Sequence, residues 1–239
     1  THIHLDHAGA AGWLARQGAR IHVHPKGYAH MLNPQKLLSS AERIYGDQLE
    51  SLWGEFLPVP SSQLSVLQDG DIVNVNGLRF AAIDTPGHSD HHLAYLYDDI
   101  CFTGDIGGVR LQGSNHIRLP TPPPEFNVEK WKASLKRLQT YPFSYIALTH
   151  FGQFSDCDMH LTALEKALDE LEGWMATNML DDPPLAELNQ RFSNWMGKIT
   201  LSQGLDENLS QAYEIVNPTW MCIHGIVRYW NKNRKQQQG

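Results

Sequence analysis

Apolar residues spaced three and four positions apart predict helices in several stretches of the chain. The first covers residues 8 to 17, which are rich in alanine and stop at Gly18. The next, residues 34 to 48, lies between strands, so we expect it to form an inserted helical cover. Residues 128 to 138 and 158 to 175 each carry one apolar face. Beyond Asp182 and a Pro-Pro break, the chain is predicted to be helical to its end.

Alternation of apolar and polar residues predicts strands between these helices. Residues 19 to 25 form a short candidate strand, and residues 65 to 88 contain Asp-Gly and Asn-Gly turns typical of hairpins. The same rhythm continues over residues 92 to 105, and a further strand is predicted to end at His150. We therefore expect an α/β domain over residues 1–180 and a helical appendage over residues 181–239.

Composition narrows the class of protein. The chain has 239 residues, 41% of them hydrophobic, which suffices for one large globular domain with an appendage. A net charge of -7 without clustered Lys and Arg argues against nucleic acid as a partner. No apolar run approaches the roughly 18 residues that span a bilayer, so we expect no membrane segment. Three cysteines without a CxxC pair give no disulfide framework, which favours a reducing, cytoplasmic location.

The chain opens on a cluster of metal-type ligands, His2, His4, Asp6 and His7. His2 and His4 are two residues apart, so an extended backbone points both imidazoles to one side, where they can grip one ion. Asp6 and His7 are adjacent and send their side chains in different directions, which suits a second ion nearby.

Three later residues extend this set: His88 in TPGHSDHH, Asp105 in FTGDIGG and His150 in LTHFG. Each follows a predicted strand end or a turn with Gly or Pro, where sheets present functional groups. The alternative, that all seven are ordinary surface or core residues, fits poorly with their spacing and order. His22 and His24 share a predicted strand face and could rim a pocket, but we leave them out of the site.

The segment THIHLDHAG resembles the THxHxDHxGG motif of the metallo-β-lactamase superfamily, and the later ligands follow in that family's order. The resemblance covers residues 1 to about 180 and implies an αββα sandwich. It implies that one ion binds His2, His4 and His88, that the other binds Asp6, His7 and His150, and that Asp105 bridges the two. The family's first strands precede this motif, so we expect the chain to begin within its domain, with part of one sheet absent.

Two divalent ions would share a bridging hydroxide, with Asp6 and Asp105 as the carboxylates of the catalytic centre. We therefore expect a hydrolase of small esters, thioesters or lactones, similar to the glyoxalase II-like branch in its full HxHxDH set. Zinc is the default metal, and iron and manganese suit the same ligands. The stretch LTHFGQFSD lacks that branch's GHEYT-like pattern, which makes glutathione thioesters doubtful substrates.

An oxidoreductase is the main alternative. Persulfide dioxygenases of the same superfamily hold one iron with two His and one Asp and retain the neighbouring motif residues, so the sequence separates the two poorly. A non-catalytic member would be expected to lose ligands, and none is lost here. His7 argues against the commonest dinuclear β-lactamases, and His4 against flavodiiron oxygen reductases.

Further residues near the motifs are secondary candidates. His92 follows His88 by four positions, and it either orients a metal ligand or is a buried histidine bonded to backbone. The loop from Ile106 to Phe126 is expected to overhang the metals, with Arg110 and Arg118 either holding an anionic substrate or remaining solvated. Tryptophans of the C-terminal helices would cover the pocket or form a homodimer contact.

Overall fold

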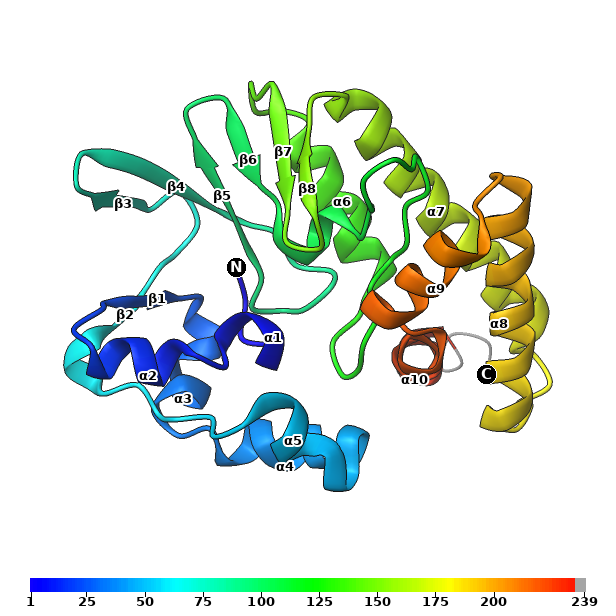
Figure 1. Ribbon diagram of the computed structural model, residues 1–239, viewed down its shortest axis with the longest axis horizontal. Helices are drawn as coiled ribbons and strands as arrows, with labels where there is room; N and C mark the ends of the chain where they lie inside the picture. The colour runs from blue at the N-terminus through cyan, green and yellow to red at the C-terminus, as the bar shows by residue number, and fades with distance from the viewer. Residues whose placement is uncertain (235–239) are drawn as a thin grey trace. The chain divides into compact units, whose positions relative to one another are not determined.

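The computed structural model describes residues 1–234, and its contacts divide the chain into two compact units (Figure 1). The first unit comprises Thr1–Asp84 and His91–Tyr95. The second comprises Thr85–Asp90 and the chain from Leu96 onward. The boundary expected near residue 180 stays a prediction.

The first unit combines short helices with two sets of strands. Strand β1 (Ile21–Val23) pairs in parallel with β2 (Leu64–Val66), and β3 (Ile72–Val75) forms an antiparallel hairpin with β4 (Leu78–Asp84). The helices are α1 (Leu5–Ala8), α2 (Ala11–Arg16), α3 (Pro25–Leu32), α4 (Gln35–Tyr45) and α5 (Leu49–Trp53), with 3-10 turns η1 (Gly46–Gln48) and η2 (Ser61–Gln63).

Turn chemistry explains where the strand prediction succeeds and where it is wrong. Asn76 and Gly77 both have positive φ, 50° and 88°, as a tight hairpin turn requires, and they join β3 to β4 as predicted. The Asp69-Gly70 turn joins no hairpin, because β2 pairs with β1. The strand predicted through His24 ends at Val23. His24 is instead the N-cap of α3, accepting a hydrogen bond from Lys26 N at 3.1 Å.

An apolar cluster holds the first unit together. Ile3, Val23 and Met31 are each at most 5% exposed and pack in one core. Gly27 of α3 lies against it, and a Cβ there would come within 2.9 Å of Ile3 and 2.7 Å of Val23 side-chain atoms. The predicted cover forms as α4 followed by η1, and it contributes buried Ala41 to the same core.

The second unit contains the last two residues of β5 (Leu93–Tyr97) and three further strands. Strand β6 (Ile100–Phe102) pairs in parallel with β7 (Tyr145–Leu148), which pairs antiparallel with β8 (Gly152–Phe154). A 3-10 turn, η3 (Gly104–Gly107), follows β6. The helices are α6 (Val128–Leu138), α7 (Cys157–Asn178), α8 (Leu185–Ser202), α9 (Glu207–Val216) and α10 (Thr219–Tyr229), the last extended by a π-helical turn (Trp230–Arg234).

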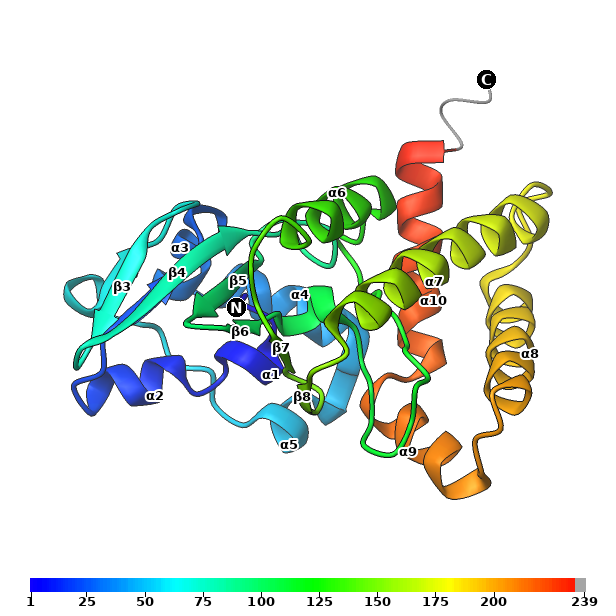
Figure 2. The same cartoon turned by 90° about the horizontal axis from the view of Figure 1, so that it is seen from above.

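The helices of the second unit lie in two neighbouring pairs, α6 beside α7 and α8 beside α10 (Figures 1 and 2). The predicted apolar stripe of α7 is confirmed, because Leu161, Leu164, Leu168 and Leu171 are at most 2% exposed. Trp131 of α6 is fully buried, and its indole nitrogen donates to Ile106 O at 2.8 Å. This bond ties α6 to the turn that follows β6.

Tyr213 of α9 is fully buried and fastens the C-terminal helices to a distant loop. Its hydroxyl donates to His116 O at 2.6 Å and accepts from Leu111 N at 3.0 Å. Both partners lie about a hundred residues earlier in the chain, so the C-terminal helices are an integral part of the second unit.

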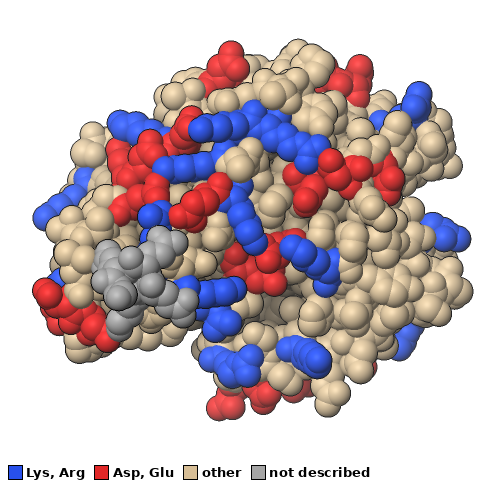
Figure 3. Space-filling view, turned by 180° about the vertical axis from the view of Figure 1, so that it is seen from behind, with Lys and Arg blue, Asp and Glu red and all other residues tan. Residues whose placement is uncertain are grey.

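Charged side chains of both signs are interspersed on the face shown in Figure 3. Lys132 pairs with Asp169 at 2.5 Å and with Glu172, and Arg234 pairs with Glu129 at 2.7 Å. These pairs link α6, α7 and the π-helical turn. Among the described residues, no helix combines the length and apolarity needed to cross a bilayer.

Replacing Gly87 by alanine tests how tightly the second unit is packed around the TPGH turn. Gly87 has φ +145°, and an added Cβ would lie 2.4 Å from Trp131 Cα. We expect Gly87→Ala to lower the free energy of unfolding by about 2 to 4 kcal/mol, measured by urea denaturation. In the control Gly173→Ala, an open helical position, stability should rise by up to about 1 kcal/mol. Equal stability of the two variants would contradict the packing argument.

Candidate metal centre

His2 and His4 lie on one side of the chain in the first unit. His4 is the N-cap of α1 with an extended backbone, φ -62° and ψ 157°. His2 Nε2 lies 2.9 Å from His4 Nδ1. Two nitrogens bound to one tetrahedral zinc at 2.0–2.1 Å would lie about 3.3 Å apart, so this pair is close to the spacing that an ion requires.

Asp6 and His7 lie next to that pair, on the single turn of α1. His7 Nε2 is 3.2 Å from Asp6 Oδ2, and the His7 ring centroid is 4.0 Å from that of His2. His2 is 5% exposed, whereas the Asp6 carboxylate is 36% exposed. The structure thus brings these ligand candidates together, with buried imidazole on one side and an open carboxylate on the other.

Two more histidines of the first unit support His2 and its neighbours. His92 is fully buried, and its ring stacks on His2 with centroids 5.0 Å apart. His91 Nδ1 accepts a hydrogen bond from Ile3 N at 3.4 Å. His92 therefore limits the orientation of the His2 ring, the kind of role that a neighbour of a metal ligand performs.

Asp105 is the centre of the second unit's group. It lies in η3 directly after β6, and its side chain is 4% exposed. Its Oδ2 is 3.3 Å from His88 Nε2, and its Oδ1 is 3.5 Å from His150 Nε2. One buried carboxylate thus presents each of its oxygens to a different imidazole.

His88 is held in a defined tautomer. Its side chain is 1% exposed, and its Nδ1 lies 2.7 Å from Pro120 O. A backbone carbonyl only accepts, so Nδ1 carries the proton and Nε2 keeps the lone pair that a metal needs. Pro120 lies 32 residues away in the Pro-rich loop, and no local pattern in the sequence indicates this contact.

His150 is positioned through its backbone. Arg110 N donates to His150 O at 3.3 Å. The Arg110 guanidinium is held by both oxygens of Asp156, at 2.8 and 2.9 Å, and lies 4.2 Å from the Phe154 ring centroid. This pairing lowers the pKa of the Asp156 carboxyl. Both expectations for Arg110, substrate binding and solvation, are wrong, because the side chain is buried in an ion pair.

Comparison with known proteins decides the family. The family model for the metallo-beta-lactamase superfamily matches residues 1–150. The chain belongs to this superfamily. A metallo-beta-lactamase fold-containing protein of Sulfurisphaera tokodaii, ST1585, is 29% identical over 159 residues, 65% of this chain and 60% of that protein. A hydroxyacylglutathione hydrolase of Aeromonas hydrophila is 36% identical over 142 residues, 59% of this chain and 42% of that enzyme.

Solved structures of the superfamily support the predicted α/β fold. The crystal structure of ST1585 aligns with a TM-score of 0.59 at 28% identity, covering 72% of this chain and 66% of that one. A metallo-beta-lactamase family protein of Thermus thermophilus, TTHA1429, covers 97% of this chain and 73% of its own, with a TM-score of 0.68 at 20% identity. The chain spans 60% or less of the length of the two curated relatives named above. The structural match to ST1585 confirms the predicted α/β class.

The donor set within each unit consists of imidazole nitrogens and carboxylate oxygens, which suit a divalent ion. Imidazole and carboxylate together fit zinc, iron and manganese. The two oxygens of Asp105 face separate histidines, as in a carboxylate that ligates through both. The assignment of all seven residues to one centre stays a prediction.

Other residues singled out in the sequence have different roles. Arg118 is 3% exposed and pairs with Glu214 at 2.5 Å, so the expectation of a solvated or substrate-binding arginine is wrong here too. Its Nε donates to His116 Nε2 at 3.4 Å, and burial lowers the pKa of His116 to about 4. His22 and His24 line a pocket of the first unit together with His2 and His7, and His24 Nε2 lies 3.4 Å from Asp84 Oδ1.

A pH dependence of stability follows from His160, which sequence analysis missed. It is fully buried beside Arg110, its Nε2 lies 2.8 Å from Gly107 O, and burial lowers its pKa to about 4. The His160 side chain takes up a proton near pH 6.5 in the unfolded chain and near pH 4 in the folded chain. The free energy of unfolding is therefore highest above pH 6.5 and decreases as the pH falls below that value. We expect His160 to lower the free energy of unfolding by about 2 kcal/mol when the pH falls from 7 to 5.

The measurement is urea denaturation at pH 7 and pH 5. In His160→Gln the loss of stability between these two pH values should shrink by about 2 kcal/mol. The control His224→Gln, an exposed position on α10, should keep the dependence of the unmodified chain. An unchanged loss in His160→Gln would contradict the assignment.

Proposed function

We propose that this chain is a metal-dependent hydrolase that cleaves small thioesters, esters or lactones with two divalent ions. The observation that carries the proposal is the buried Asp105 carboxylate, whose two oxygens face His88 and His150 separately. A carboxylate in that arrangement is suited to join two cations, because each oxygen has its own partner.

The number of donors supports two ions. Six terminal ligands and one bridging carboxylate exceed what one tetrahedral ion can use. In the proposed centre His2, His4 and His88 would hold one ion, Asp6, His7 and His150 would hold the other, and Asp105 would contribute to both. Zinc is the proposed metal.

The chain's own residues would prepare the reaction as follows. When bound, the two ions would lower the pKa of a shared water and polarise the scissile carbonyl. Pro120 O keeps the Nε2 lone pair of His88 directed away from the backbone. Asp6, with its partly open carboxylate, would take a proton from the incoming water and pass it to the leaving thiol or alcohol.

The relatives' names favour thioesters within this class. One is a hydroxyacylglutathione hydrolase, and another, 28% identical over 142 residues, is an atrochrysone carboxyl ACP thioesterase of Aspergillus fumigatus. The chain covers 33% of the latter and lacks the GHEYT-like stretch. We therefore propose an acyl thioester whose carrier is not glutathione.

Metal analysis and a substrate panel test this function. We expect protein purified without added metal to hold two divalent ions per chain. In a panel of a pantetheine thioester, a glutathione thioester, a lactone, a phosphodiester and glutathione persulfide, we expect hydrolysis of the pantetheine thioester or the lactone. One bound iron with oxygen consumption on the persulfide would instead establish a dioxygenase, and absence of bound metal would overturn both functions.

Asp105→Asn is the sharpest variant. It removes one anionic oxygen from between the two proposed cations, so their repulsion is less compensated. We expect less than two metal ions per chain and hydrolysis reduced by at least about a hundredfold. The control Asp98→Asn changes an exposed turn residue with φ 53°, a conformation that asparagine tolerates, and should leave both values unchanged. Full activity with two metals in Asp105→Asn would exclude it as the bridge.

A further inference from the structure

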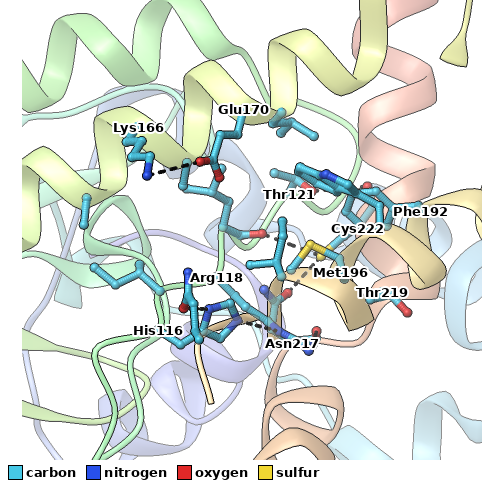
Figure 4. A pocket seen from close by; sticks show the side chains of 18 of the residues that line it. His116, Arg118, Thr121, Lys166, Glu170, Phe192, Met196, Asn217, Thr219 and Cys222 are labelled. Carbon is cyan, nitrogen blue, oxygen red and sulfur yellow. Dashed lines mark hydrogen bonds and ion pairs between the residues drawn. The ribbon is translucent and has the colours of Figure 1, made fainter. Parts of the chain in front are cut away.

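A separate cavity of about 170 Å³ lies in the second unit (Figure 4). Its walls come from residues 115 to 119 with Thr121 and from helices α7, α8 and α10. None of the seven candidate metal ligands lines it. The cavity is therefore a site distinct from the candidate metal ligands.

Much of the cavity wall is apolar. The wall includes Phe192, Trp195 and Met196 of α8 and Ala163 and Ala167 of α7. Phe192 and Trp195 belong to an aromatic cluster with Trp174, with ring centroids 5.2 to 5.9 Å apart. Walls of this kind bind apolar surface without first having to become ordered.

The wall also carries a hydrogen-bond donor. Asn217 lines the cavity at 6% exposure, and its Oδ1 accepts a hydrogen bond from the Cys222 thiol at 2.9 Å. Among the described residues, none accepts a hydrogen bond from the Asn217 amide nitrogen. The amide nitrogen keeps contact with solvent, so a ligand oxygen in the cavity can replace water as its acceptor.

The charges around the cavity cancel. Arg118 is paired with Glu214, and Lys166 is paired with Glu170 at 3.5 Å (Figure 4). His116 is neutral at ordinary pH because burial lowers its pKa to about 4. A charged ligand would find no uncompensated partner here, so the lining favours an uncharged one.

We propose that this cavity binds a small uncharged carbonyl compound with an apolar body, its oxygen accepting from Asn217. The volume sets the size, because engineered cavities of about 150 Å³ hold a benzene ring. An aryl ketone, ester or amide with one ring matches both the volume and the Asn217 donor. This site is independent of the proposed hydrolysis.

Ligand-detected NMR and calorimetry on the full chain test the site with acetophenone and ethylbenzene, which differ by a carbonyl in place of a methylene. We expect acetophenone to bind one to one with Kd below about 1 mM and roughly fivefold more tightly than ethylbenzene. Chelator treatment should leave both Kd values unchanged, because the lining contains no candidate metal ligand.

Filling the cavity provides the decisive variant. Ala167→Phe should weaken acetophenone binding at least about tenfold, whereas Ala176→Phe, exposed on the same helix, should not change it. If Ala167→Phe does not fold by circular dichroism, Ala163→Phe on the same wall replaces it. No saturable binding to the unmodified chain, unchanged binding in the filled variant, equal affinity for ethylbenzene, or loss of binding with chelator would each overturn the proposal.

Discussion

Burial of the Asp105 carboxylate is the constraint on which the second unit depends. A charge taken out of water is costly unless opposite charges or hydrogen bonds replace the water. Here the Nε2 atoms of His88 and His150 face its two oxygens, and because Nε2 of His88 carries a lone pair it cannot compensate the charge, which a bound cation would do. Each ring is in turn fixed by backbone, His88 by Pro120 O and His150 through Arg110 N. The carboxylate thus determines how the ends of two strands and one Pro-rich loop must lie.

Long-range bonds keep these loops in place. The Trp131 indole holds the carbonyl of Ile106, the residue after Asp105, and Tyr213 joins two points of the following loop. Arg110 and Asp156 close the same region through two charge-assisted hydrogen bonds. The C-terminal helices therefore help to hold this loop in place.

The sequence predicted those parts of the fold that are specified locally. Helix α6 begins and ends where its three-four spacing indicates, and Asn127 caps it by accepting from Lys130 N at 2.8 Å. Proline occurs after strands as readily as at helix starts. Pro25 therefore did not indicate a helix, and α3 was not predicted. Strand β8 has three residues, too few to show alternation.

The candidate site was also predictable only where neighbouring residues determine it. The approach of His2 to His4 follows from their spacing, whereas His88, Asp105 and His150 come together only through the folded sheet, and the family motif alone indicated them. Arg110 and Asp156 are 46 residues apart, and nothing near either residue reveals the partner. An unpaired arginine in a loop is predicted to be solvated, so both roles proposed for Arg110 were wrong.

The Pro-rich loop serves two sites with adjacent residues. Pro120 O holds His88, while Leu119 and Thr121 on either side line the cavity. Proline has little backbone freedom, so the carbonyl and the cavity wall move together. Lengthening this loop by one residue would therefore displace the His88 ring and reshape the cavity wall together.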